Sequence, residues 1–252
     1  MISINDYDTG FKMESNLIRK LKTKCIILID QLNSVPIFFV KEPTMDKHCS
    51  TKCLRRDCTN DYIMTYKREM ENGNLSRKEE VEETMKKLEE CRGKCNAIGC
   101  YIPTADDISD KPHILICPER INHRNKSQFH DLLLEVIIHE LTHAYFSTGN
   151  DLNDLSKHII EESLCEAYAF SKFENTEHLI EFIADPKRPP EYTAFKFWTE
   201  ISRNMPLILL MIEWKNKNYN MFPFGIFPIP YEIFFRRSGS LERLALLLLS
   251  FS

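Results

Sequence analysis

The segment with the clearest chemistry is 138–144, with the sequence Ile-His-Glu-Leu-Thr-His-Ala. Its two histidines, His139 and His143, are four residues apart, so a helix places them one above the other on the same face. Two imidazoles in this arrangement can bind one Zn²⁺ through nitrogen. Glu140 would project beside the metal, where a bound water would lie. Because the helix is otherwise apolar, the pattern indicates a zinc site rather than a chance pair on a solvated face.

A zinc ion that does chemistry needs a third protein ligand and an open fourth position. The metzincin pattern, with a glycine three residues and a histidine six residues after His143, is absent, because Phe146 and Gly149 occupy those positions. Two candidates for the third ligand remain downstream. Glu162 follows His143 after 18 intervening residues, and His158 follows it after 14. The spacing of the sequence by itself leaves both open.

The spacing H-E-x-x-H-x18-E resembles that of the gluzincins, which are thermolysin-like and aminopeptidase-like zinc peptidases. The segment 161–169, Glu-Glu-Ser-Leu-Cys-Glu-Ala-Tyr-Ala, resembles their ligand helix. In that helix, a carboxylate four residues after the liganding glutamate orients a zinc-bound histidine. The resemblance therefore implies that Glu162 is the third ligand and that Glu166 fixes the tautomer of His139.

With this assignment, we expect Glu161 to be solvated and His158 to be a polar residue of the first helical turn. A liganding His158 would instead resemble the SprT-like DNA–protein-crosslink proteases and would favour a protease that acts on nucleic-acid-linked substrates. The charge distribution argues against that alternative, because Arg55, Arg56 and scattered lysines form no basic stripe interleaved with aromatic residues. We therefore expect no nucleic-acid partner.

Residues 113–173 resemble the core of the mitochondrial inner-membrane metallopeptidases that process an ATP-synthase subunit. The similarity covers Ile-Leu-Ile-Cys at 114–117, His-Glu-Leu-Thr-His-Ala-Tyr at 139–145 and Asp-Leu-Asn-Asp-Leu-Ser-Lys-His at 151–158. The segment 161–169 is also similar to plant LIM-associated peptidases. These resemblances imply a zincin-like α+β fold, with a small twisted sheet, the motif helix on the floor of a cleft and a mostly helical C-terminal part.

Such a fold implies hydrolysis of a protein or peptide substrate. Zn²⁺ would polarise the scissile carbonyl and lower the pKa of bound water to about 7, while Glu140 would act as the general base. An extended substrate would pair with an edge strand, either 99–102 or 113–117. The developing oxyanion also needs a donor, for which the candidates by residue type alone are Tyr192, Tyr219 and Tyr231.

Apolar periodicity outlines the elements that must position this site. It predicts strands over 35–40, 99–102 and 113–117, with the last two adjacent. Helices are predicted over 14–32, 127–146, 156–173, 194–203 and 207–215, with a terminal helix from Leu241 and with Ser127 as an N-cap. We expect one domain over 1–252, with a Cys-rich insertion over 45–100 and a helical subdomain over 185–252.

The insertion carries a repeated cysteine spacing, C-x3-C-x4-C, at Cys49, Cys53 and Cys58 and again at Cys91, Cys95 and Cys100. The polar segment between the clusters, 59–90, is predicted to form a helical hairpin that turns at Asn72-Gly73-Asn74. Antiparallel arms would place Cys53 opposite Cys91 and Cys49 opposite Cys95. Two disulfides, a four-thiolate zinc site and reduced thiols all remain open, and Cys58 and Cys100 do not fit this symmetry.

The composition excludes several classes of protein. A chain of 252 residues with 43% hydrophobic residues and 7 glycines can bury a core and should be rich in helices. Its net charge of −4 gives no sign of a dedicated nucleic-acid binder. No apolar stretch reaches the roughly 18 residues of a membrane span, and no signal peptide is evident, so we expect a soluble intracellular protein, most simply cytoplasmic.

One alternative from another class is a non-catalytic binding protein that uses zinc for structure and the Cys-rich hairpin for recognition. The intact Glu140 weighs against it. A purely structural zinc site needs no general base and normally fills all four ligand positions with protein groups.

Overall fold

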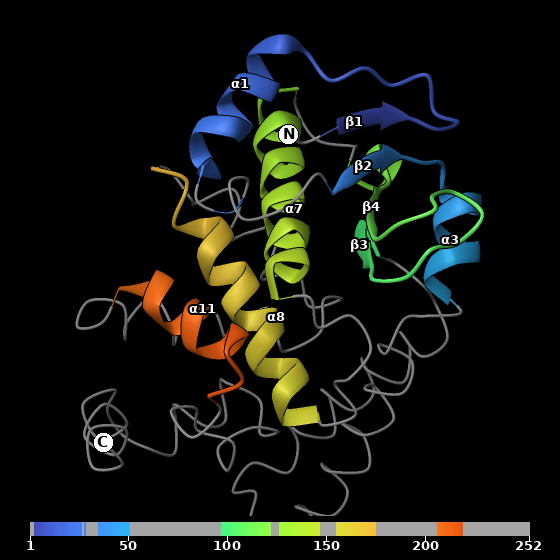
Figure 1. The fold of residues 1–252 in the computed structure, drawn as a ribbon. Helices are drawn as coiled ribbons and strands as arrows, with labels where there is room; N and C mark the ends of the chain where they lie inside the picture. The colour runs from blue at the N-terminus through green and yellow to red at the C-terminus, as the bar shows by residue number, and fades with distance from the viewer. Residues whose placement is uncertain are drawn as a thin grey trace, which may run out of the picture.

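The computed structural model of the chain describes residues 3–26, 28, 35–50, 97–121, 126–146, 155–174 and 206–218. Within these ranges the protein is mixed α+β and contains a small four-stranded sheet, in agreement with the expected class (Figure 1). Its strands are β1 (Ser3–Asp6), β2 (Pro36–Phe39), β3 (Gly99–Ile102) and β4 (His113–Ile116). Its helices are α1 (Ser15–Lys24), α3 (Glu42–Ser50), α6 (Pro118–Ile121), α7 (Lys126–Phe146), α8 (Leu155–Phe170) and α11 (Leu207–Lys215).

The strands follow the order β1-β2-β4-β3. β1 pairs parallel with β2 and β2 parallel with β4, whereas β3 pairs antiparallel with β4, with Cys100 opposite Leu115. The expected adjacency of 99–102 and 113–117 is confirmed. β4 lies inside the sheet, so the prediction that 113–117 could be an edge strand is wrong, and β3 is the edge nearer to the motif helix. β1 was not predicted, because Ser-Ile-Asn-Asp contains a single apolar residue.

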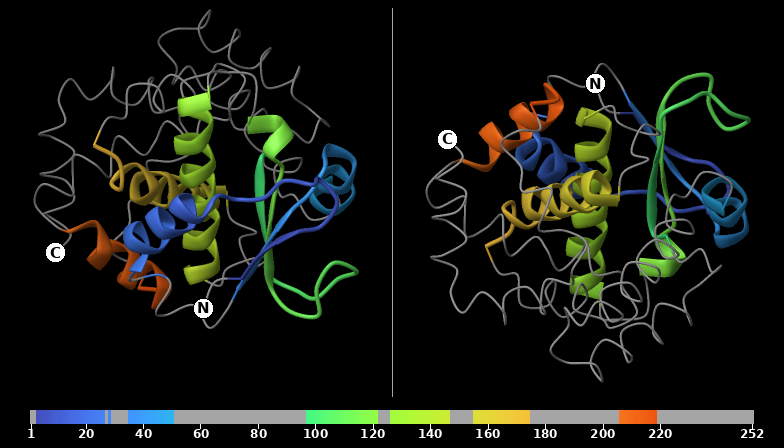
Figure 2. Two further views of the ribbon diagram at one scale, coloured as in Figure 1. Left: turned by 90° about the horizontal axis from the view of Figure 1, so that it is seen from above. Right: turned by 90° about the horizontal axis from the view of Figure 1, so that it is seen from below.

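Side chains alternate between the two faces of the sheet, and each face has its own cover. Ile114 and Ile116 belong to the main core, which includes α7, whereas Leu115 packs with Met45 of α3 on the opposite face. Figure 2 shows α7 on one side of the sheet, with α1, α8 and α11 beyond it, and α3 on the other side. Burying each such aliphatic side chain contributes about 1.5–3 kcal/mol.

α7 is the central element of this arrangement. It contacts β3, β4, α1, α6, α8 and α11. Most of its residues from Leu132 to Phe146 are buried, so the histidine motif is held on a helix that is packed on nearly every side. Among the described residues, no helix combines the length and the apolarity that crossing a membrane requires.

The helix and strand boundaries mostly follow the apolar periodicity. The predicted bounds of β3 and α11 agree with the structure, and those of β2, β4, α7 and α8 differ by one to three residues at an end. α7 begins at Lys126, so Ser127 lies inside its first turn and the prediction of an N-cap there is wrong. α1 ends at Lys24, because Cys25 leaves the helical region with φ −114° and ψ 20°. The predicted helix over 14–32 is therefore interrupted at a buried core position.

Several predictions fall outside the described residues. Most of the Cys-rich insertion lies there, including Cys53, Cys91 and Cys95, and Cys49 is described only as a backbone position in α3. The same holds for the helices predicted at 194–203 and from Leu241, and only 206–218 represents the predicted subdomain 185–252. These predictions stay predictions.

The carboxylate of Asp106 stabilises the loop between β3 and β4. Its Oδ1 accepts hydrogen bonds from the backbone N–H groups of Ile108 and Ser109, at 2.9 and 3.3 Å. Its Oδ2 lies 3.0 Å from Nδ1 of His48 in α3, and its Oδ1 lies 3.4 Å from Nε2 of His113. Burial raises the pKa of Asp106, but the bond from Ile108, the charge of His113 and the remaining hydrogen bonds outweigh burial and lower it.

We expect the Asp106→Ala variant to lose about 2–3 kcal/mol of unfolding free energy at neutral pH, because two backbone donors and the imidazole of His48 lose their acceptor. The folded pKa of Asp106 lies below the ordinary aspartate value of 3.8. Its stabilisation is thus complete above that value and is lost as the pH falls through the folded pKa. Urea unfolding from pH 7 down to about 2 measures the trend.

The neighbouring Asp107 provides the matched control. Its carboxylate is exposed and pairs with Lys47, so the Asp107→Ala variant should change the unfolding free energy little. Equal losses for the two variants, or a difference that persists unchanged at the lowest pH, would contradict the role assigned to Asp106.

Candidate metal centre

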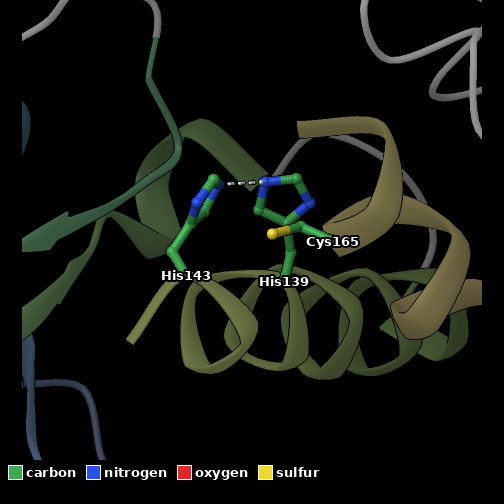
Figure 3. A group of neighbouring side chains, drawn as sticks. All are labelled: His139, His143 and Cys165. Carbon is green, nitrogen blue, oxygen red and sulfur yellow. Dashed lines mark hydrogen bonds between the residues drawn. The ribbon is translucent and has the colours of Figure 1, made fainter. Parts of the chain in front are cut away.

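Two packed helices bring the candidate site together. α7 supplies His139, Glu140 and His143, and α8 supplies the acidic segment 161–166. Figure 3 shows the two imidazoles standing side by side on α7, one helical turn apart, with the side chain of Cys165 reaching toward them from α8. The i,i+4 spacing places the rings on one face, and the contact between α7 and α8 provides the carboxylates.

A carboxylate oxygen lies within hydrogen-bond distance of the Nδ1 atom of each histidine. Glu166 Oε2 lies 2.7 Å from Nδ1 of His139, which is the contact that the gluzincin resemblance implied. Glu161 Oε1 lies 2.9 Å from Nδ1 of His143. An ionised carboxylate can only accept a hydrogen bond, so each Nδ1 carries a proton, and Nε2 is the nitrogen of each ring that could bind a metal.

The two Nε2 atoms face each other, and a carboxylate oxygen that could serve as a third metal ligand lies close to both. They are 3.2 Å apart, as the dashed line in Figure 3 marks. Glu162 Oε2 lies 3.1 Å from Nε2 of His139 and 3.4 Å from Nε2 of His143. Tetrahedral donors at zinc distances of about 2.0–2.1 Å are separated by about 3.3–3.4 Å. The three atoms therefore form a triangle of the size that a zinc ion requires.

The electrostatics of the site favour positive charge. Burial opposes protonation of His139, but the hydrogen bonds to Glu162 and Glu166 outweigh burial and raise its pKa well above the usual value. Burial likewise opposes protonation of His143, yet its pKa is raised well above the usual value by Cys165, by the charge of Glu162 and by the hydrogen bond to Glu161. A metal cation bound between these side chains would be stabilised by the same carboxylates.

Glu140 lies between the imidazoles and the edge strand. Its side chain is 7% exposed, and burial raises the pKa of its carboxyl, against the opposing charges of His139 and His143. A hydrogen bond with the backbone of Tyr101 in β3 also favours the ionised form. Gly99 permits this close approach, because a Cβ there would lie 2.7 Å from both Cγ and Oε1 of Glu140.

Cys165 is a further potential ligand that sequence reasoning did not assign. It is a fully buried free thiol, and its Sγ lies within 4.8 Å of a ligand atom of both His139 and His143. Burial raises the pKa of the thiol to about 11. Without a metal, Cys165 is therefore protonated at neutral pH, whereas a bound zinc ion would favour its thiolate.

The structure places together five of the residues predicted for the site and leaves others untested. His139, Glu140, His143, Glu162 and Glu166 meet as described above. The prediction of a solvated Glu161 is wrong, because this side chain is 2% exposed and touches both His143 and Trp214.

His158 lies in the first turn of α8, as expected, and its side chain is outside the described residues. The oxyanion candidates Tyr192, Tyr219 and Tyr231 are outside them as well. Sequence reasoning missed Gly99 and Trp214. No local pattern marks either residue, since each acts through a contact between segments that are distant in the chain.

Comparisons of the chain with protein-family models, with curated proteins and with solved structures find no significant match.

Proposed function

We propose that the chain is a zinc-dependent peptidase of the zincin type, in which His139, His143 and Glu162 hold Zn²⁺ and Glu140 is the general base. One observation carries the proposal. Two Nε2 atoms and one carboxylate oxygen converge with mutual distances of 3.1–3.4 Å, while both Nδ1 atoms are held by carboxylates. Histidine ligands of zinc typically have such a carboxylate on their second nitrogen.

The proposed set of metal ligands leaves a coordination position for water or a substrate. Two nitrogens and one carboxylate oxygen make three ligands, which leaves the fourth position of a catalytic zinc open. His139 is buried, whereas the side chains of His143 and Glu162 are each 14% exposed. A catalytic centre needs such partial exposure if water and a peptide carbonyl are to reach it.

The remaining residues supply the proton chemistry and the substrate position. When bound, Zn²⁺ supplies Lewis acidity, which polarises a carbonyl and acidifies water. Glu140, held beside the imidazoles by β3, accepts a proton from the attacking water and transfers it to the leaving amine. β3 pairs only with β4 among the described strands, so its other edge can pair with an extended peptide. The substrate class is therefore a protein or peptide in an extended conformation.

The direct test combines metal analysis with a search for cleavage. Purified protein should contain at least one tightly bound zinc, and mass spectrometry should detect products from a diverse peptide library. A zinc chelator should abolish cleavage, and added Zn²⁺ should restore it. Absence of zinc from the protein, or cleavage that survives complete metal removal, would overturn the proposal.

Gly99→Ala tests how Glu140 is placed. The added methyl group would meet Glu140 and also Val136 Cγ1 at 2.8 Å, so Glu140 must move. We expect cleavage to fall by about 10²-fold, the scale for a misplacement of about 1 Å, with unchanged zinc content. The matched control is Cys100→Ala, since Cys100 packs on the opposite face of β3. Full activity of Gly99→Ala would show that Glu140 does not depend on this contact.

Cys165 supports a second candidate function, a closed zinc site that only stabilises the fold. Its thiolate could fill the fourth ligand position together with the two histidines and Glu162. The Cys165→Ala variant separates the two candidates. A catalytic site should keep its zinc and its activity, whereas a closed site should lose affinity. In the Co²⁺-substituted protein, a thiolate-to-metal charge-transfer band that disappears in this variant would favour the closed site.

A further inference from the structure

Helix α11 reaches the candidate metal centre through one hydrogen bond. Trp214 is fully buried, and its indole Nε1–H donates to Glu161 Oε2 at 2.9 Å. The other oxygen of Glu161, Oε1, lies 2.9 Å from Nδ1 of His143. One carboxylate thus connects an indole on α11 with an imidazole on α7, and the indole lies 53 residues beyond that carboxylate in the chain.

The two histidines differ in how they are held. His139 on α7 is oriented by Glu166 on α8, so this pair involves only the two helices that carry the candidate ligands. His143 is oriented by Glu161, and the carboxylate of Glu161 is itself fixed by Trp214 from α11. A glutamate side chain has several rotatable bonds, and a second hydrogen bond restricts it to the rotamer that faces the imidazole.

The chemistry of α11 indicates that this contact is specific. The other buried residues of α11 are Leu210 and Met211, which carry no hydrogen-bond donor in their side chains. A phenylalanine in place of Trp214 would fill much of the same apolar volume but would leave a buried carboxylate oxygen without this donor, which is costly. Packing of α11 alone would require only an apolar side chain at this position, whereas the indole N–H also holds the carboxylate of Glu161.

We propose that Trp214 is a positioning residue of the metal centre, which holds Glu161 against His143 and thereby sets the affinity for zinc. The inference rests on the proposed function, because it presumes that His143 binds the metal. It adds that α11, from the C-terminal part of the chain, is required for full zinc affinity. α11 therefore contributes to metal binding and not only to the stability of the fold.

The central experiment measures zinc affinity of the full chain by competition with a chelator of known affinity. Trp214→Phe should bind zinc about 10-fold more weakly than wild type, the lower end for losing such an indirect contact. Leu210→Ala is the packing control, because it removes buried apolar volume from the same helix and removes no hydrogen-bond donor. It should leave zinc affinity unchanged while it lowers the unfolding free energy. Equal weakening by both variants would overturn the inference.

A double-mutant comparison shows whether Trp214 acts through Glu161. In a Glu161→Ala background, Trp214→Phe should cause no further loss of zinc affinity. In a Glu166→Ala background, which removes the separate support of His139, it should still cause its full loss. Additive losses in both backgrounds would mean that Trp214 acts only on the fold. If Glu161→Ala does not fold, Glu161→Met, which fills a similar volume without an acceptor oxygen, is used in its place.

Fluorescence gives a readout that does not depend on catalysis. The chain has two tryptophans, so in Trp198→Phe the emission comes from Trp214 alone. We expect added Zn²⁺ to change this emission, and we expect the change to vanish when Glu161 is also replaced by Ala. If Zn²⁺ binds wild type but leaves the emission of Trp198→Phe unchanged, the inference fails and the proposed function survives. If wild type binds no zinc, both fail.

Discussion

Replacing Glu140 with Gln is expected to reduce peptide cleavage by about 10²–10⁴-fold and to leave zinc content and folding intact. The two side chains are nearly isosteric, so the fit against Gly99 is retained. The amide oxygen can still accept the hydrogen bond from the backbone of Tyr101. What the amide cannot do is accept a proton from water. Cleavage rates on a selected peptide, measured together with zinc content and a urea unfolding curve, separate these effects.

The control for this exchange is Glu42→Gln, at an exposed position of α3 on the opposite side of the sheet. It should cleave at the wild-type rate. If Glu140→Gln cut as fast as wild type while a chelator still stopped both proteins, a metal-dependent reaction would proceed without Glu140. The general base would then have to be another residue.

Replacing Glu162 with Ala is expected to remove zinc and activity together. Glu162 Oε2 is the carboxylate oxygen that lies within 3.4 Å of both Nε2 atoms, so its loss leaves two protein ligands. His143→Ala should have the same effect, because it removes one of the nitrogens. Zinc content should fall by about one per chain in each variant, as measured by elemental analysis of the purified protein.

His158→Ala is the matched variant for the other ligand that the sequence allows. This variant should retain its zinc and its activity, because Glu162 already provides the third ligand atom beside the two Nε2 atoms. The reverse result, with zinc retained in Glu162→Ala and lost in His158→Ala, would overturn the assignment of the third ligand. It would also favour the SprT-like alternative, which stimulation of cleavage by DNA would then test.

Much of the candidate site could be predicted because it lies along two helices. The i,i+4 spacing of His139 and His143 fixes their relative placement as soon as the segment is helical. The same spacing relates Glu162 to Glu166, so one helix presents both a candidate ligand and a carboxylate for His139. The bounds of β3 and α11 were also predicted, because apolar runs between polar or Pro-containing segments mark such elements well.

The errors share a physical cause. The expectation of a solvated Glu161 is one of them. Its burial depends on Trp214 and His143, which approach it from two other elements. The pairing of β1 and the interior place of β4 likewise depend on hydrogen bonds between strands that are far apart in the chain. Local sequence patterns carry no information about such partners.

The sequence by itself determined the chemical identities and the helical register of the candidate ligands, because covalent spacing and helix geometry are local properties. Tertiary structure decided which side chains meet. It placed the edge strand at Gly99 against Glu140, the thiol of Cys165 beside the imidazoles and the indole of Trp214 on Glu161. Those contacts depend on how helices and strands pack across long stretches of chain, which is settled by burial of the whole core rather than by any single segment.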